Sequence, residues 1–263
     1  MIVNSYHEEK EAMFSPEVFY GERKYICDTA IATFSCEIFN AVTEQYPHEK
    51  VAQVGSANGH RPVYLLDING KSVVFYMSSI SACLAGNDII EVQWQTGIKN
   101  LIISGSCGAL DSEATDGKYI IPTQAYRDEG MSYHYAKPSD YMDIRNSGKL
   151  AGIFEKLKLP YVQGRIWTTD APYRETQTAF AKRKNEGCIA VEMELSGIQA
   201  VCDFHGIELY SFLVTGDVLD GEKYIPDGLT EANHSLDKFF IALKIWENIR
   251  IDGGNYHGEN GIQ

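Results

Sequence analysis

The chain has few basic residues for its acidic content, and it lacks any long apolar run. Its 263 residues carry 23 lysines and arginines against 36 aspartates and glutamates, a formal charge of −13 at pH 7. This charge repels nucleic acid backbones and acidic lipid surfaces. No stretch of about 18 apolar residues occurs, and the N-terminal MIVNSYHEEKEAMF has neither the basic nor the apolar region of a signal peptide. We therefore expect a cytoplasmic protein that binds neither nucleic acid nor a membrane.

The cysteines show no spacing typical of a metal site or a redox pair. The six cysteines are scattered, with no C-x-x-C pair and no histidine cluster at zinc spacing: Cys27, Cys36, Cys83, Cys107, Cys188 and Cys202. Free thiols in a reducing compartment fit this arrangement best. We expect no metal site and no cofactor.

The chain reads as one α/β domain. Its 44% hydrophobic content and its length allow one full core over residues 1–263, with no internal repeat or low-complexity tract. Short apolar runs alternate with helical patterns, which indicates a layered fold around a sheet. The tail at 252–263 has little apolar content and is expected to be mobile or to lie at an interface.

The element pattern is specific in several places. The Asn69-Gly70 pair predicts a hairpin between strands at 63–67 and 72–77. Further strands are predicted from residue 100, ending in a Gly-rich loop, and at 119–125, 161–167, 188–191 and 208–215. Helices are predicted at 27–46, 82–95, 146–156, 175–185, 193–205 and 232–249.

Three acids stand out against apolar sequence. Glu192 and Glu194 lie in IAVEMELSG, where a helix is expected to start, and Asp217 ends the buried run LYSFLVTGD. Burying a carboxylate costs several kcal/mol unless it is paired or hydrogen-bonded. The helix dipole explains one glutamate but not Asp217. Burial would raise the pKa of Asp217, which would allow it to act as a general acid.

Two polar segments and a Gly-rich segment add candidate ligand contacts. Gly105 and Ser106 follow an apolar strand, where backbone N–H groups can bind an anion, although a tight turn explains the glycines equally well. RDEGMSYHY, with Arg127 and His134, is dense in hydrogen-bonding groups but also typical of a surface loop. TTDAPYRE reads first as a helix start, yet it leaves Tyr173 and Arg174 free to contact a base.

Taken together, these segments resemble the nucleoside phosphorylase superfamily of purine nucleoside phosphorylase, uridine phosphorylase and methylthioadenosine nucleosidase. The resemblance runs from about Gly70 to Gly221 and is carried by GSCGAL, RDEGMSYHY, TTDAPYRET, VEMELSG and TGDVLDG. It is strongest to a subgroup with RDEG-x-SYHY and TTDAPYRET. The fold that it implies is a three-layer α/β/α sandwich with a mixed, partly closed central sheet. It also implies a homo-oligomer, as a dimer, trimer or hexamer, in which a neighbour often completes the site.

The resemblance implies roles residue by residue. Glu194 would accept hydrogen bonds from the ribose hydroxyls, Met193 would pack beneath the sugar, and Glu192 would be a supporting acid. Asp217 would protonate purine N7 while phosphate, the co-substrate, attacks the sugar. The implied phosphate contacts are Gly105 and Ser106, and the implied base pocket contains Thr169, Tyr173 and Arg174.

The chain departs from the family pattern around phosphate. Ile103-Ser104 stands where an arginine is expected, and no G-D-P-x-R motif is visible, although Arg23 and Arg61 could substitute. Gly216 replaces the serine that commonly precedes the catalytic acid, and Lys223 could replace a later arginine. We predict a phosphate-dependent nucleoside phosphorylase with a purine preference. The alternatives are a uridine phosphorylase, a nucleosidase that uses water, and a nucleoside-binding module without catalysis.

Overall fold

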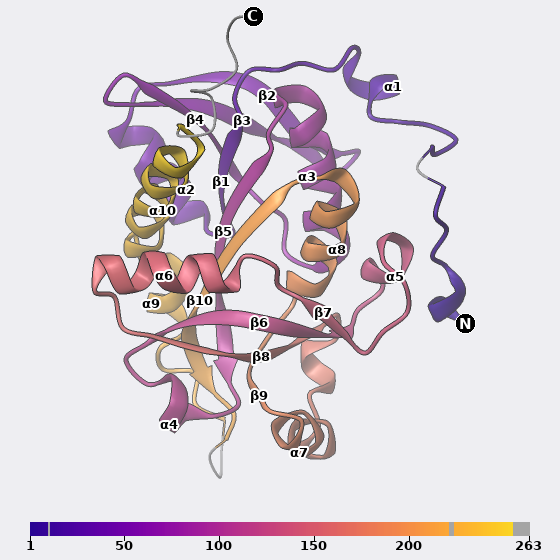
Figure 1. Ribbon diagram of the computed structural model, residues 1–263, viewed down its shortest axis with the longest axis vertical. Helices are drawn as coiled ribbons and strands as arrows, with labels where there is room; N and C mark the ends of the chain where they lie inside the picture. Colours follow the sequence, from indigo (N-terminus) through magenta and orange to yellow (C-terminus); the bar gives the residue numbers. More distant parts are fainter. Residues whose placement is uncertain (10, 221–223, 255–263) are drawn as a thin grey trace, which may run out of the picture.

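The computed structural model describes residues 1–9, 11–220 and 224–254 and is shown in Figure 1. Ten strands form one mixed sheet. Their bounds are β1 Thr29–Thr33, β2 His48–Ser56, β3 Gly59–Ile68, β4 Lys71–Met77, β5 Asn100–Ala109, β6 Tyr119–Asp128, β7 Tyr141–Asp143, β8 Tyr161–Thr169, β9 Cys188–Glu192 and β10 Glu208–Val218.

Helices connect and cover these strands. Their bounds are α1 Glu17–Tyr20, α2 Cys36–Gln45, α3 Ala82–Thr96, α4 Ser112–Thr115, α5 Ser132–Tyr135, α6 Ser147–Leu157, α7 Gln177–Asn185, α8 Leu195–His205, α9 Leu229–His234 and α10 Asp237–Gly254, with 3-10 turns η1 Ile2–Asn4 and η2 Pro172–Arg174.

The sheet is partly closed on itself. Its strand order is β10-β6-β8-β9-β5-β1-β4-β3-β2, with β7 beside β6 and a second pairing between β10 and β5. Strands β5, β9, β8, β6 and β10 therefore form a closed circuit, while β1 to β4 extend it as an open sheet. This confirms the mixed, partly closed sheet that the family resemblance implies.

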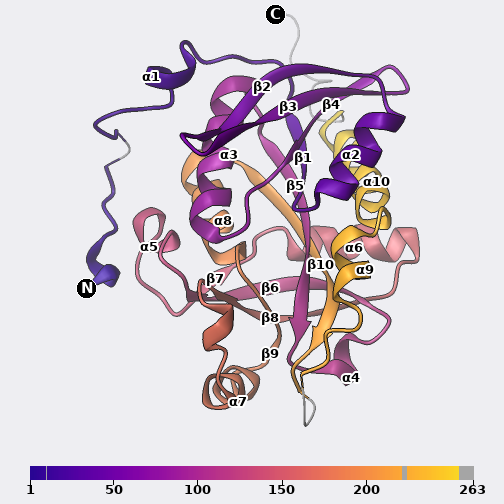
Figure 2. The same cartoon turned by 180° about the vertical axis from the view of Figure 1, so that it is seen from behind.

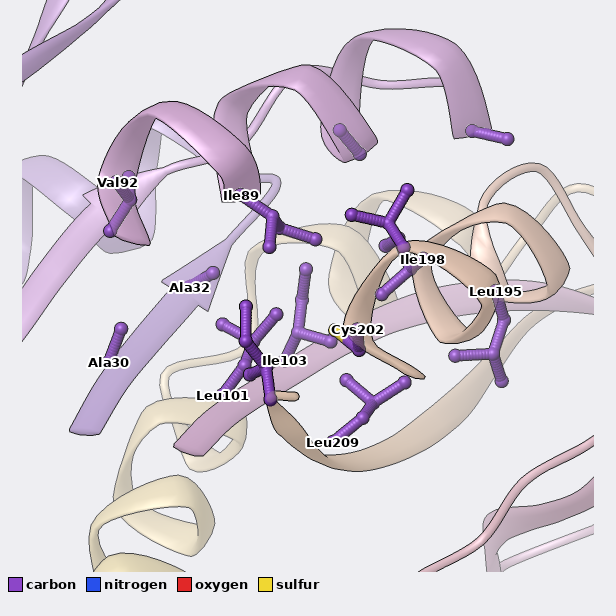
Figure 3. Close-up of a cluster of buried hydrophobic side chains, with 14 of the residues drawn as sticks. Ala30, Ala32, Ile89, Val92, Leu101, Ile103, Leu195, Ile198, Cys202 and Leu209 are labelled. Atoms are coloured by element: carbon purple, nitrogen blue, oxygen red, sulfur yellow. The ribbon is translucent and has the colours of Figure 1, made fainter. Parts of the chain in front are cut away.

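Helices pack on both faces of the open part of the sheet (Figures 1 and 2). Residues of one strand alternate between two cores: Ala30 and Ala32 belong to the cluster under α3 and α8, whereas Ile31 packs with α2, α6 and α10. Figure 3 shows the first cluster, with Ile89 from α3 and Ile198 from α8 facing the strands. Alternation with period two is the expected result when both faces of a strand are buried. The three-layer α/β/α arrangement is confirmed.

The predicted helix at 27–46 is wrong in its first part. Thr29–Thr33 is strand β1, buried at all five positions and paired in parallel with β4 and β5. A short apolar run does not by itself distinguish a buried strand from a helix, and here pairing with two neighbours decides. The helix that follows starts at Cys36, because the Ser35 side chain accepts the Ile38 N–H and caps it.

Two other segments differ from prediction. The expected Gly-rich loop at Gly105–Gly108 is part of strand β5, paired in register with β10. The expected helix at 232–249 is two helices, α9 and α10, separated at Ser235. The hairpin at Asn69-Gly70 is confirmed, with φ of 55° and 77° at these two residues.

The remaining expected elements are present within a few residues of their predicted bounds. Of the predicted tail, residues 252–254 belong to α10, and the rest, like Lys223, lies outside the described residues. Across 1–9, 11–220 and 224–254, no helix combines the length and apolar character needed to cross a bilayer.

Candidate functional site

One cavity of about 960 Å³ gathers most of the predicted site residues. Its volume is in the range of small-molecule sites. Its lining includes Phe34, Ser35, Ile80, Gly105, Ser106, Gly108, Tyr173, Glu175, Glu192, Met193, Glu194, Asp217, Tyr224, Asn233, His234 and Lys238. The three acids that the sequence singles out therefore share one site.

The cavity opens where strand β5 changes neighbours. On one side β5 pairs with β1 up to Ser104, and it then pairs with β9 from Gly108. Gly105, Ser106 and Cys107 lie in the gap between these two pairings. In α/β sheets, ligands bind at such switch points because the diverging strands leave a crevice with free backbone groups.

Glu192 ends strand β9 and caps helix α8. Its Oε2 accepts the N–H of Glu194 at 2.7 Å and that of Leu195 at 2.8 Å, and its Oε1 accepts the Thr168 hydroxyl. Burial, with the charge of Glu194 added, raises the pKa of Glu192. The predicted stabilisation at a helix start therefore applies to Glu192, while Glu194 stands at the N-cap position with its side chain elsewhere.

Glu194 is held by a strained segment before α3. Its Oε1 accepts the backbone N–H of Ser81 at 2.8 Å, and the Met193 carbonyl accepts the N–H of Ala82. Ser81 has φ 91° and ψ 146°, a conformation that residues other than glycine rarely adopt. Burial raises the pKa of Glu194. Local strain that positions a buried carboxyl in a cavity is typical of a functional site.

A β-bulge in strand β10 determines the orientation of Asp217. The register with β5 shifts at Gly216, so that Thr215 pairs with Cys107 and Asp217 with Gly108. An added Cβ on Gly108 would lie 3.2 Å from the Asp217 carboxyl and 2.4 Å from Leu219, so the glycine leaves room for both side chains. Burial raises the pKa of Asp217, although the Tyr224 hydroxyl donates to it. The direction of this shift agrees with the sequence prediction.

Glu175 is a second acid near Asp217. It lines the same cavity, and burial together with the charge of Asp217 raises its pKa to about 7. Tyr173 stands at the mouth of the cavity, where its side chain is fully exposed. An exposed ring at the mouth is available to stack on a planar base.

A cluster of polar groups surrounds Gly105 and Ser106. The Ser106 hydroxyl donates to Asn233 Oδ1, and Ser35 Oγ lies 2.7 Å from His234 Nδ1. The Phe34 ring packs 3.6 Å from the position of a Cβ on Gly105. Because strand residues rise about 3.3 Å each, Gly105 and Gly108 lie on the order of 10 Å apart along β5. The hydroxyl cluster and Asp217 therefore occupy separate parts of the cavity.

Gly216 has a packing role. Gly228, which precedes α9, approaches so closely that an added Cβ on it would lie 2.8 Å from the Gly216 carbonyl oxygen. An added Cβ on Gly216 would itself lie 3.0 Å from Leu229. The glycine at this position thus lets α9 lie against β10, which brings Asn233 and His234 to the cavity.

Arg127 and His134 lie away from the cavity. The Arg127 guanidinium is buried and donates to Ser132 Oγ at 2.8 Å, to the Lys137 carbonyl at 2.7 Å and to Ser139 Oγ at 3.1 Å. It also stacks 4.2 Å from the Tyr133 ring centroid. His134 is exposed on α5. The Arg127 contacts therefore hold this loop in place, and the loop does not line the cavity.

Four further candidates also lie off the cavity lining. Arg61 donates to both Asp88 carboxylate oxygens at 2.9 and 2.8 Å and to Ser79 Oγ at 2.7 Å, which braces the segment before Ser81. Arg23 is exposed and packs on Tyr25 and Trp94. Thr169 is buried and accepts the Ala171 N–H, and Arg174 is exposed.

The lining residues that the sequence did not identify include Phe34, Ser35, Glu175, Asn233, His234 and Lys238. The first two were hidden by the helix predicted at 27–46, and the last three by the helix predicted at 232–249. Ser235 carried a weak signal, because a serine immediately before an apolar residue, here Leu236, is a candidate helix start.

The comparisons with known proteins concern the family and the fold of the chain. The model of the Phosphorylase superfamily matches residues 29–244. A DeoD-type purine nucleoside phosphorylase of an Exiguobacterium species is 26% identical over 204 residues, which is 76% of this chain and 78% of that protein. The uncharacterised protein R802 of Acanthamoeba polyphaga mimivirus is 28% identical over 164 residues, which is 60% of this chain and 63% of the viral protein's length.

Solved structures share the fold at low identity. Purine nucleoside phosphorylase from Toxoplasma gondii, in complex with immucillin-H, has a TM-score of 0.70 at 16% identity and covers 87% of this chain and 93% of its own. Futalosine hydrolase of Helicobacter pylori, a mutant, has a TM-score of 0.67 at 13% identity, with coverage of 84% and 100%. AMP nucleosidase from Bacteroides thetaiotaomicron has a TM-score of 0.66 at 17% identity, with coverage of 86% and 90%. The match over residues 29–244 establishes that the chain belongs to the phosphorylase superfamily of nucleoside phosphorylases and nucleosidases.

Proposed function

We propose that this protein cleaves the N-glycosidic bond of a purine nucleoside with phosphate, giving the free base and ribose 1-phosphate. One observation carries the proposal: Asp217, Glu194 and the Gly105–Ser106 segment line the same cavity at the switch point of β5. These are the groups that leaving-group protonation, sugar binding and nucleophile binding require.

Each group has a defined part in the reaction. Glu194 would accept hydrogen bonds from the ribose hydroxyls, and Met193 would contact the sugar. The bond between C1′ and N9 breaks, its electron pair goes to the purine, and the Asp217 carboxyl donates a proton to N7. A phosphate oxygen forms the new bond to C1′. Burial raises the pKa of the Asp217 carboxyl, and this direction favours its protonated form, which is the form a proton donor needs.

The position of Asp217 supports a purine over a pyrimidine. Uracil has no N7 to protonate, so a uridine phosphorylase would have no such use for this acid. Arg174, which the resemblance implies in the base pocket, is exposed and outside the cavity lining. A module that binds nucleosides without turnover would need neither the strain at Ser81 nor a raised pKa at Asp217.

Hydrolysis by water is the second candidate. Among the described residues that line the cavity there is no arginine, and the Phe34 ring packs against Gly105, where phosphate would bind. Bidentate arginine contacts are a common means of holding phosphate. Futalosine hydrolase and AMP nucleosidase share the fold.

Product analysis separates the candidates. The protein is incubated with inosine, adenosine or uridine, in phosphate-free buffer and with added phosphate, and the sugar product is identified by mass spectrometry. We expect ribose 1-phosphate from the purine nucleosides only when phosphate is present. Ribose formed at equal rates without phosphate would establish hydrolysis, and no cleavage under either condition would refute the proposed function.

A homo-oligomer is part of the proposal. Several apolar side chains near the N-terminus are at least one third exposed in the single chain, among them Phe14, Val18 and Phe19. Apolar groups gathered in this way are typical of a subunit interface. Sedimentation analysis of the intact chain tests the expected association.

A further inference from the structure

Lys238 is a buried cation without an acidic partner among the described residues. It lies in the first turn of α10, and it is 4% exposed. Its Nζ donates to the carbonyl oxygens of Ala232 at 2.5 Å and Asn233 at 3.0 Å. Across 1–9, 11–220 and 224–254, no carboxylate oxygen lies within 4.0 Å of this nitrogen.

A buried ammonium without a counter-charge is costly. Neutral carbonyl groups compensate part of the lost hydration, but a full charge is normally retained inside a protein only when it is paired. Burial lowers the pKa of Lys238 to about 8, so the side chain is still mainly charged at neutral pH. An ammonium has three N–H donors, and the two carbonyls use two of them.

The surroundings of Lys238 fit an anion. It lines the cavity together with Ser106 and Ser35, and the Asn233 side chain joins the two regions by accepting the Ser106 hydroxyl. The backbone of Gly105–Cys107 lies in the gap between the pairings of β1 and β9. Hydroxyls, backbone N–H groups and one cation form a suitable set of donors for phosphate oxygens.

We propose that Lys238, with the hydroxyls of Ser106 and Ser35, forms a phosphate site in which Lys238 supplies the charge of the missing arginine. The proposal rests on the proposed function, because the site would hold the nucleophile of the reaction. The same chemistry would also bind a phosphate monoester carried by the nucleoside, so two sources of the phosphate group must be separated.

A purely structural role for Lys238 explains fewer of these observations. Lysines commonly bind the last carbonyls of a helix, and Ala232 and Asn233 lie in the final turn of α9. This role accounts for two hydrogen bonds. It does not account for a buried, unpaired charge at the wall of a cavity, since an exposed lysine would bind the same carbonyls at lower cost.

Phosphate binding by three variants tests the site. Lys238→Gln retains amide donors for the two carbonyls and removes the charge, Lys238→Arg restores the charge, and Lys50→Gln, at an exposed lysine, is the matched control. Titration calorimetry with inorganic phosphate, in chloride buffer, measures affinity without turnover. A charge-assisted hydrogen bond contributes about 1.5–3 kcal/mol, so we expect at least about a tenfold weaker affinity in Lys238→Gln.

Kinetics add a second readout. In Lys238→Gln the KM for phosphate should rise by at least about tenfold while the KM for the nucleoside changes by less than about twofold. Lys238→Arg should recover part of the phosphate affinity. A folded Lys238→Gln protein that binds phosphate as the wild type does would overturn the proposal. If no nucleoside is cleaved but phosphate binding still depends on Lys238, the proposed function fails and the anion site stands.

A comparison of two substrates shows whether the site binds inorganic phosphate or the phosphate group of a nucleoside monophosphate. Inosine with inorganic phosphate is compared with inosine 5′-monophosphate alone. A loss confined to the first reaction in Lys238→Gln identifies inorganic phosphate, and a loss confined to the second identifies the monoester.

A measurement on the wild-type protein tests the proposal even if the Lys238 variants do not fold. Sulfate keeps its charge from pH 6 to 9, so its affinity should fall as pH rises through the pKa of Lys238, about 8. The other titratable groups of the cavity include the Cys107 thiol, whose pKa is raised above that range by burial, His234, and four acids whose pKa values burial raises: Glu175, Glu192, Glu194 and Asp217. The titration is repeated in His234→Asn to separate the imidazole. It is also run in Glu175→Gln and Glu194→Gln, where a fall in affinity that persists belongs to neither of these acids. An affinity that is constant across pH 7 to 9 would contradict the proposal.

Discussion

Ser35 Oγ lies 2.7 Å from His234 Nδ1, although 199 positions separate the two residues. The contact joins the turn between β1 and α2 to the end of α9. On its other side, the imidazole Nε2 lies 3.7 Å from Glu37 Oε1. Because Ser35 also caps α2, the position of this helix, of the cavity wall and of α9 depends on one hydroxyl.

Removing either partner of this contact should weaken nucleophile binding. A hydrogen bond contributes about 1 kcal/mol net, so His234→Ala is expected to raise the KM for phosphate about fivefold to tenfold. Ser35→Ala should have a similar effect plus the loss of the helix cap. Steady-state kinetics of both single variants and of the double variant test the coupling. Effects that simply add would show that the two side chains act independently.

Asp217→Asn should lower turnover on purine nucleosides by about 10²-fold or more, because an amide has no acidic proton for the leaving base. Asp227→Asn is the matched control, at an exposed aspartate. Single-turnover rates with inosine measure the chemical step. An unchanged rate in a folded Asp217→Asn protein would remove this residue from the mechanism.

Glu194→Gln should reveal the sugar contact. If the carboxylate accepts hydrogen bonds from ribose hydroxyls, the loss in kcat/KM should be larger for inosine than for 2′-deoxyinosine, by about 1.5–3 kcal/mol. Equal losses on the two substrates would argue against this contact. Glu231→Gln, on the exposed surface of α9, serves as the control.

Ionisation of Glu175 should make kcat/KM depend on pH near neutrality. Burial and the charge of Asp217 raise its pKa to about 7, so it is neutral below that pH and ionised above it. Ionisation of Glu175 places a negative charge near the leaving base, which disfavours the electron pair that the purine takes from the broken bond, so kcat/KM should fall as pH rises through about 7. In Glu175→Gln this fall should disappear, whereas it should remain in Glu113→Gln, at an exposed glutamate. A fall that persists in Glu175→Gln would assign it to another group.

Arg127 is expected to matter for stability and not for chemistry. Arg127→Met leaves the Ser132 hydroxyl and the Lys137 carbonyl without their donor, and unsatisfied buried groups should reduce the free energy of unfolding by about 2–4 kcal/mol. Arg145→Met breaks an ion pair between the exposed Arg145 and Asp203 and should cost less than about 1 kcal/mol. Urea unfolding followed by circular dichroism measures both. A loss of activity in Arg127→Met without a loss of stability would reverse this assignment.

The hairpin at Asn69-Gly70 and the helix at 82–95 were predictable because their signals are local. Two adjacent residues that tolerate positive φ specify a tight turn, and a long helical pattern needs no distant partner. Strand β1 was not predictable in this way. Residues 29–33 become a strand because β4 and β5 pair with them, and these partners lie more than 40 positions away.

The candidate site shows the same division. Glu192, Glu194 and Asp217 were identified from the sequence, because an acid at the end of an apolar run stands out without any knowledge of the fold. The pattern did not distinguish Arg61, which pairs with Asp88, from an arginine that binds a ligand. Ser35, His234 and Lys238 carried no sequence signal strong enough to place them together, because the helix break at Ser235 depends on how α9 packs against Gly216.

The sequence by itself determined the α/β class, the family pattern and the acids at the centre of the site, because these depend on local composition and on motifs. Only the tertiary structure decided which groups surround Gly105 and Ser106. The change of partners along β5 opens the cavity, and the close approach of α9 to β10 places Lys238 at its wall. Such contacts between distant segments form only when the sheet closes, so no local pattern specifies them.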